Sequence, residues 1–183
     1  MVRRMSKVVT HHILSAVSGL LFVLGSIAPA QAGDLAVEEK VKAIRSRYEK
    51  VERALKDCKQ VKRDLPGESA EGGELTGYFS GGSLRKLVAK FYGETGQARE
   101  EYYFWDDQLF FVLRVESRYD KPLSGNVVRK SEERFYFTDD TLIRWLDPEK
   151  KEVSAGPAFQ DRGREWIDQA RKYSDLARRG PSE

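Results

Sequence analysis

The segment Tyr78-Phe79-Ser80-Gly81-Gly82-Ser83-Leu84 occurs twice more in variant form. The other copies are Tyr103-Phe104-Trp105-Asp106-Asp107-Gln108-Leu109 and Tyr136-Phe137-Thr138-Asp139-Asp140-Thr141-Leu142. Each copy has two aromatic residues, a polar segment centred on Gly-Gly or Asp-Asp, and a leucine before another run. Strand-forming residues on both sides of such a turn are typical of a β-hairpin. Three successive hairpins predict an antiparallel meander.

Six strands are predicted around these turns, at residues 75–79, 84–92, 98–105, 108–118, 127–137 and 141–147. Alternation of side chains assigns their faces. In the last strand it places Arg144 on the same face as Leu142 and Leu146. In the second strand it separates an apolar set from a mixed set, Leu87, Ala89 and Phe91 against Lys86, Val88, Lys90 and Tyr92. One face of the meander therefore meets a helix, and the other mixes aromatic and charged residues.

Two helices are predicted to flank the meander of residues 73–147. Residues 33–66 form the first, because apolar residues from Val37 to Leu65 recur at alternating steps of four and three. Residues 157–180 form the second. The narrow seam of the first helix, which includes Cys58, packs on the sheet of the same molecule or pairs with a second copy. We expect an α+β fold with one domain over residues 33–183.

The first 32 residues have the composition of a secretory signal peptide. Arg3, Arg4 and Lys7 precede an uncharged, mostly apolar run, and small residues in A-x-A spacing predict cleavage after Ala32. The run is shorter than the roughly 20 residues that span a bilayer. We therefore expect an exported protein, periplasmic or extracellular, with no stable membrane span after cleavage.

Charge and histidine content exclude several function classes. The chain has 32 Lys and Arg and 29 Asp and Glu, but three of the basic residues lie in the leader. The rest is formally neutral, so nothing favours nucleic-acid binding. Both histidines, His11 and His12, also lie in the leader, which excludes Ser-His-Asp catalysis and imidazole zinc sites elsewhere. Cys58 is the single cysteine, so no internal disulfide forms. We predict no cofactor and no metal.

Paired carboxylates are the remaining candidates for catalysis. Asp106-Asp107 and Asp139-Asp140 have the position and residue type of turns, and a calcium site needs more, interleaved ligands. Glu100-Glu101 and Glu132-Glu133 lie on strands beside Lys and Arg, which is typical of cross-strand ion pairs. Two carboxylates can hydrolyse glycosides without histidine. A carboxylate-dependent enzyme acting on cell-wall or polysaccharide material is therefore an alternative.

The mixed face supplies a candidate binding surface of Lys86, Lys90, Tyr92, Arg114, Arg118 and Arg144. Cations beside aromatic rings suit an unknown acidic protein, an anionic glycan or a lipid head group of the envelope. Alternatively, these cations balance the neighbouring glutamates. We expect a non-enzymatic binding module, and a structural homodimer through the N-terminal helix is a further alternative.

Residues 73–147 also carry a resemblance. The segments GGELTGYFSGGSLRKLVAKFYGETGQAREEYYFWDDQLFFVL and EERFYFTDDTLIRWLD resemble a group of small exported bacterial proteins of unknown function. The resemblance implies a leader, a helix and an aromatic meander, and it assigns no catalytic or binding residue. The hairpins are also similar to YY-x-x-G-x-L repeats of the MORN-variant type, which implies an interaction surface. Asp-Asp replaces the Gly-containing turn in two of the three copies.

Overall fold

The computed structural model describes residues 29–69 and 71–179. The predicted leader lies mostly outside these ranges. Its last residues, up to the predicted cleavage position after Ala32, form the first turn of α1 (Pro29–Ala54). No helix in the described ranges is long and apolar enough to cross a membrane.

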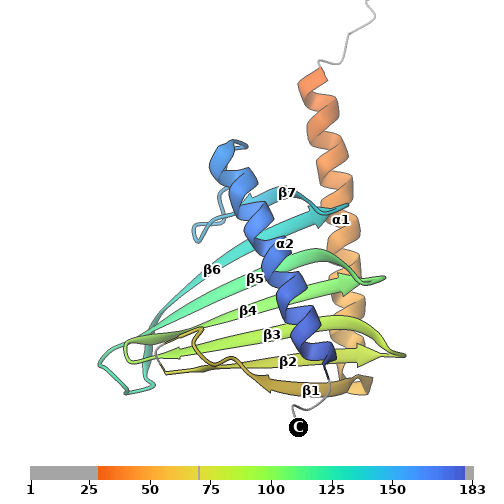
Figure 1. Cartoon of the computed structure of the whole chain (residues 1–183). Coiled ribbons are helices and arrows are strands. Elements are labelled where there is room, and N and C mark those ends of the chain that lie inside the picture. Colours follow the sequence, from red (N-terminus) through yellow and green to blue (C-terminus); the bar gives the residue numbers. More distant parts are fainter. Residues whose placement is uncertain (1–28, 70, 180–183) are drawn as a thin grey trace, which may run out of the picture.

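Seven antiparallel strands form one sheet in chain order (Figure 1). They are β1 (Lys59–Asp64), β2 (Gly73–Ser80), β3 (Ser83–Gly93), β4 (Gly96–Trp105), β5 (Gln108–Tyr119), β6 (Val127–Thr138) and β7 (Thr141–Leu146). A short 3-10 helix, η1 (Leu55–Asp57), joins α1 to β1, and α2 (Pro157–Arg178) follows β7. The predicted α+β meander is confirmed, with seven strands in place of about six.

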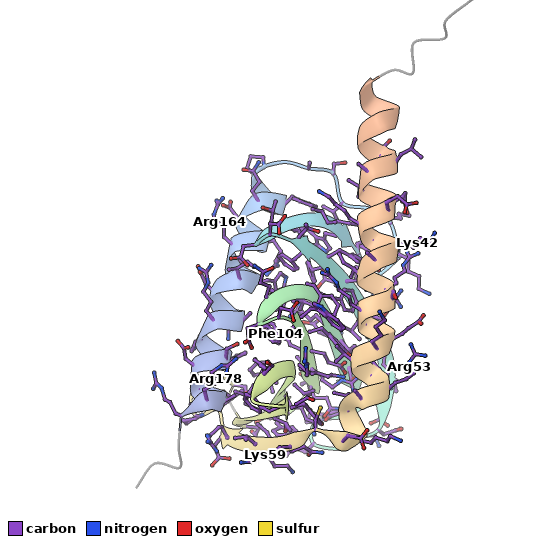
Figure 2. The ribbon with its side chains drawn as sticks, turned by 90° about the vertical axis from the view of Figure 1, so that its right-hand side faces the viewer. Lys42, Arg53, Lys59, Phe104, Arg164 and Arg178 are labelled. Atoms are coloured by element: carbon purple, nitrogen blue, oxygen red, sulfur yellow. The ribbon has the colours of Figure 1, made fainter. Side chains whose placement is uncertain are left out.

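The sheet lies between the two helices, with α1 on one face and α2 on the other (Figure 2). Each helix covers its own apolar cluster. The cluster under α2 is the larger and includes Leu87, Tyr102 and Phe135 from the sheet. The cluster under α1 is centred on Tyr103, Phe111 and Tyr136, and its helix lies near the end of the strands that carries the repeated turns (Figure 1). The start of α1 extends beyond the sheet.

Residues 59–64 form a strand, which corrects the prediction that the N-terminal helix continues to residue 66. Val61 and Leu65 continue the helical spacing, but α1 ends at Ala54 and β1 pairs along its length with β2. The extended chain lets Leu65 reach the cluster under α2, on the opposite face from α1. The exposed residues of β1 are polar or charged, which protects an edge strand from pairing with another chain.

The apolar seam of α1 packs on the sheet of the same molecule. Val41, Ile44 and Val51 are buried there, and the ring of Tyr48 lies 4.9 Å from that of Tyr103. The residues that a homodimer through this seam needs are therefore already in contact with the sheet. Cys58 follows the end of the helix and is half-buried, and burial raises the pKa of its thiol.

The three repeated segments form the same kind of turn. Each connects its strands through two residues with positive φ, at 58° and 84° for Gly81 and Gly82, 50° and 60° for Asp106 and Asp107, and 49° and 54° for Asp139 and Asp140. Positive φ at both central residues defines a type I′ turn, whose twist matches that of the flanking strands. Asp tolerates this conformation better than most residues, which explains its use at these turns.

Replacing Asp139 by Asn and Asp140 by Gly is expected to raise the free energy of unfolding by roughly 0.5–1 kcal/mol, because Gly adopts positive φ without strain. The exposed ion pair between Asp140 and Arg171, 3.2 Å long, contributes little and is lost. The reverse change, Gly81→Asp with Gly82→Asp, is expected to lower stability by a similar amount. Urea denaturation of both variants checks this, and changes of the same sign would contradict it.

Each repeated segment also contains a β-bulge at its Tyr-Phe step. The second strand of each hairpin has one extra residue there: Arg85, Phe110 or Ile143. Residues on either side of the extra one therefore face opposite sides of the sheet. Leu142 packs under α2 whereas Arg144 faces α1, which corrects the assignment of both to one face.

Candidate functional site

A row of six side chains crosses the sheet under α1. Strand pairing joins Tyr78, Lys86, Tyr103, Phe111, Tyr136 and Arg144 in sequence from β2 to β7. The three tyrosines are the first residues of the three repeated segments, so the repeat builds the row. The bulges bring Lys86, Phe111 and Arg144 opposite these tyrosines. The result is an aromatic centre with a cation toward each end.

Ion pairs fix α1 over this row. Glu52 lies 2.7 Å from the Nζ of Lys86, and Glu38 lies 2.6 Å from a terminal nitrogen of Arg144. The two glutamates are fourteen residues apart, which is about 21 Å along a helix. Four strand spacings from β3 to β7 cover about 19 Å. The spacing of charges on the helix therefore matches the width of the sheet that it crosses.

The six residues of the predicted binding surface do not form one exposed surface. Lys86 and Arg144 are buried beneath α1, with 6% and 8% of their surface exposed. For both residues the alternative holds that the cations balance neighbouring glutamates, because each contacts two glutamates. Two others share the face of α1 beyond the helix: Lys90 pairs with Glu74, and Tyr92 is exposed.

The other two predicted residues lie on the face of α2. Arg114 contacts three carboxylates there, those of Glu100, Glu116 and Glu133. Arg118 follows it on the same face by alternation and is exposed. The register between strands decides this separation. Arg114 pairs with Glu100, which pairs with Ala89 of the α2 cluster, whereas Lys86 pairs with Tyr103 of the α1 cluster.

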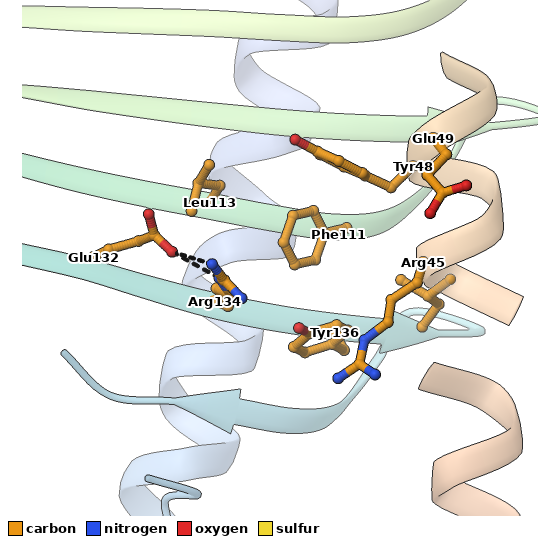
Figure 3. Close-up of a pocket in the computed structure, with 9 residues that line it drawn as sticks. Arg45, Tyr48, Glu49, Phe111, Leu113, Glu132, Arg134 and Tyr136 are labelled. Carbon is orange, nitrogen blue, oxygen red and sulfur yellow. Dashed lines mark hydrogen bonds and ion pairs between the residues drawn. The ribbon is translucent and has the colours of Figure 1, made fainter. Parts of the chain in front are cut away.

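A hollow of about 360 Å³ opens beside α1 on the mixed face (Figure 3). We call it the α1 pocket. It has an apolar and aromatic part, formed by Ile44, Tyr48, Phe111, Leu113 and Tyr136. Its charged residues are Arg45 and Glu49 from the helix and Glu132 and Arg134 from β6. An aromatic floor with charged groups at its margin is a common composition for a ligand site.

The charges of the α1 pocket are unevenly paired. The Nε of Arg134 donates a hydrogen bond to Glu132 over 2.7 Å. Arg45 makes no ion pair with any carboxylate of the described residues, although Glu49 lies one turn along the same helix (Figure 3). Figure 3 shows the Arg45 side chain directed toward Tyr136. The Arg45 guanidinium thus lies beside an aromatic surface and makes no ion pair among the described residues.

A second group of cations surrounds Trp105 on the other side of α1. Arg47, Lys50 and Arg85 lie 5.9, 5.9 and 5.7 Å from the centre of its ring. None of the three makes an ion pair within the described part of the chain. Like charges this close repel one another, and each is attracted to the face of the indole ring. Cations that make no ion pair among the described residues therefore lie on both sides of α1.

The glutamates of the two adjacent pairs, Glu100-Glu101 and Glu132-Glu133, make structural contacts. Glu101 pairs with Lys86, and Glu132 pairs with Arg134. Glu100 and Glu133 face α2 and share the guanidinium of Arg114, at 3.8 and 3.1 Å. Burial raises the pKa of Glu100, which suits a proton donor. The shared arginine, however, stands between the two carboxylates, so this pair does not flank an open cleft as glycoside hydrolysis requires.

Within the described residues, no group of three or more Asp, Glu, Cys or His side chains is arranged to hold a metal ion. The two Asp-Asp pairs occupy turn positions, and one member of each makes an ion pair with α2, Asp107 with Arg178 and Asp140 with Arg171.

Sequence reasoning missed the residues of the α1 pocket. Arg45 stands on a helix rich in charge, and nothing in its local pattern separates it from Lys42 or Arg53. The alignment of the three repeats could have identified Phe111 as part of the row under α1, because it makes Phe111 equivalent to Lys86 and Arg144.

No family model, no curated protein and no solved structure matches the chain.

Proposed function

We propose that the protein is a non-enzymatic binding module and that the α1 pocket is its ligand site. The ligand is an amphipathic anion, with an apolar chain or ring that ends in a carboxylate, sulfonate or phosphate. The observation that carries this proposal is the Arg45 guanidinium, which makes no ion pair among the described residues and lies beside an aromatic floor. The leader composition of residues 1–32 supports a location in the cell envelope.

The apolar part of the ligand would contact Ile44, Phe111 and Leu113. Each methylene that leaves water contributes about 0.8 kcal/mol, which is roughly a fourfold gain in affinity. The anionic part would meet Arg45, which offers a planar set of N–H donors to an oxyanion. The cations around Trp105 add to the attraction of anions toward this side of the molecule.

Binding of octanoate, hexanoate and 1-octanol by isothermal titration calorimetry tests the proposal. Octanoate is expected to bind roughly tenfold or more tightly than hexanoate, because it buries two more methylenes. Arg45→Gln is expected to weaken octanoate binding about fivefold, since a partly exposed charge contact contributes on the order of 1 kcal/mol. Octanol has no charge, so its affinity should stay the same.

Lys42→Gln is the matched control, because it removes the same charge from an exposed position of α1 outside the pocket. It should leave octanoate binding unchanged. Equal losses in the two variants would show attraction to the overall charge of the helix and not to a site. Failure of the wild-type protein to bind any alkyl carboxylate would overturn the proposal.

A further inference from the structure

Two arginines lie directly opposite each other at the end of the sheet that is far from α1 (Figure 1). Arg118 of β5 pairs with Arg129 of β6, so both side chains project from the same face, with Cβ atoms about 5 Å apart. Both residues are exposed, and neither makes an ion pair within residues 29–69 and 71–179. Like charges in this arrangement destabilise a sheet. An anion held by both guanidinium groups would remove that repulsion.

A hollow of about 570 Å³ lies beside this pair, and both arginines line it. We call it the arginine hollow. We propose that it binds a phosphoryl group, free or as a monoester, between the guanidinium groups of Arg118 and Arg129. The arginines are on the face of α2, opposite the α1 pocket, because they follow Arg114 and Glu133 by alternation. The proposal therefore does not rest on the proposed function of the α1 pocket.

Two glycines create the space beside the arginines. Strand pairing places Gly93, Gly96, Arg118 and Arg129 in one row across β3, β4, β5 and β6. The row has no side chains on β3 and β4, so the backbone of these strands forms an open floor next to Arg118. A Cβ added to Gly96 would overlap the carbonyl oxygen of Ser117, so this position admits no larger residue. The hollow is therefore a fixed feature of the backbone.

The lining of the hollow carries net positive charge. Glu116 is the carboxylate in the lining, and Arg114 already makes an ion pair with it. Its charge is therefore largely balanced before any ligand binds. Arg118 and Arg129 are the remaining charged residues of the lining. An anionic ligand here would gain two cations and meet a carboxylate that is already paired.

A phosphoryl group matches two arginines better than a carboxylate does. A phosphate monoester has a charge of about −1.5 to −2 at pH 7 and three strong acceptor oxygens. A guanidinium group donates two parallel N–H bonds to an oxyanion, so two arginines need more acceptor sites than one carboxylate offers. Ser131 adds a hydroxyl donor to the lining, and Phe91 offers a ring to the organic part of an ester.

Proton–nitrogen correlation NMR tests the proposal, because the backbone amides of Gly93 and Gly96 report on the floor of the hollow. Inorganic phosphate, phenyl phosphate, phenyl sulfate and octanoate are titrated at pH 7. Phenyl phosphate is expected to shift both signals saturably. Phenyl sulfate, with the same shape and less charge, should bind about fivefold to tenfold more weakly. Octanoate should not shift them. Tighter binding of phenyl phosphate than of inorganic phosphate identifies an ester as the ligand, and equal affinities identify free phosphate.

Arg129→Gln is expected to weaken phenyl phosphate binding about tenfold or more, because it removes one bidentate, charge-assisted contact. Without ligand, the same variant should have a melting temperature about 1–3 °C higher than the wild-type protein, since the repulsion from Arg118 is gone. Lys130→Gln is the matched control. Lys130 is the next residue of β6, is exposed and faces the other side of the sheet. Its replacement should leave phenyl phosphate binding unchanged.

Three results would overturn the proposal. Absence of a saturable shift at Gly93 and Gly96 with either phosphate compound would show that the hollow binds no phosphoryl group. Equal losses in Arg129→Gln and Lys130→Gln would show attraction to overall charge. A lower melting temperature of Arg129→Gln with unchanged binding would assign Arg129 a structural function. Arg45→Gln, which tests the α1 pocket, should not alter the glycine shifts, so the two proposals fail separately.

Discussion

Lys86→Met is expected to lower the free energy of unfolding at pH 7 by about 3 kcal/mol. The Nζ of Lys86 lies 2.8 Å from Glu101, and both side chains are almost completely buried. Removing the ammonium group leaves the Glu101 carboxylate under α1 with a reduced set of partners. Arg99 remains at 2.8 Å, which keeps the loss at the lower end of the range for a broken buried pair.

Lys90→Met is the matched control. Lys90 lies on the same strand and face, but its side chain is 43% exposed and its distance to Glu74 is 3.3 Å. An exposed pair of this kind contributes at most about 1 kcal/mol. Urea denaturation followed by circular dichroism at pH 7 measures both variants. Equal losses would mean that the Lys86 pair is no more buried in solution than that of Lys90.

The effect of Lys86→Met is expected to depend on pH. Burial by itself raises the pKa of Glu101, but the contacts with Lys86, Tyr103 and Arg99 together hold the pKa below its ordinary value. In the wild-type protein the Glu101 carboxylate therefore contributes to the free energy of unfolding at pH values above its unfolded-state pKa. This contribution is lost as the pH falls through the folded-state pKa, which is the lower of the two. Without the ammonium, burial dominates and the folded state takes up a proton above the unfolded-state pKa. The stability difference between wild type and variant should then narrow from pH 7 to pH 5, and a constant difference would contradict this.

Local signals in the sequence were sufficient for the elements of the meander. The repeated Tyr-Phe segments located the three type I′ turns, and the six predicted strands agree with the structure within two residues at each end. The second helix was also located from its spacing and its terminal Gly and Pro. Turn geometry and helical periodicity depend on neighbours in the chain, which a sequence shows directly.

The change of face at each bulge and the edge strand could not be predicted because they depend on pairing between distant residues. A bulge changes alternation by one residue, and Phe110 or Ile143 looks like any other apolar strand residue. The segment of β1 continues the helical spacing through Val61, and its polar and charged residues give no clear strand alternation. Its pairing with β2 decides the matter, and that pairing follows from the path of the chain after α1.

The surroundings of individual side chains under the two helices are even harder to predict from the sequence. Trp166 and Tyr173 have the spacing of core residues on a helix, and they are core residues. Their burial depends on the distance between α2 and the sheet. Arg45 likewise becomes distinct only because α1 crosses the aromatic row at one particular rotation.

Gly163→Ala is expected to lower the free energy of unfolding by about 2 kcal/mol, the opposite of the usual result within a helix. Replacing Gly by Ala in a helix interior normally gains up to about 1 kcal/mol, since Ala restricts the unfolded chain. Gly163 is buried where α2 meets β7, and a Cβ added there would lie 2.9 Å from the Cβ of Leu142. A Cβ atom cannot move away by a change of rotamer, so α2 or β7 must shift as a unit.

Gly33→Ala separates this contact from the helical propensity of alanine. Gly33 lies in α1, and no atom of the described residues is within 4 Å of an added Cβ, so the same substitution there should be neutral or slightly stabilising. A shift of α2 would also move Trp166, one turn after Gly163, away from Phe135, whose ring centre lies 5.0 Å from that of the indole. The tryptophan emission of Gly163→Ala should therefore move to longer wavelength while that of Gly33→Ala stays constant. A stabilised Gly163→Ala protein with unchanged emission would mean that α2 lies farther from β7 than the 2.9 Å contact implies.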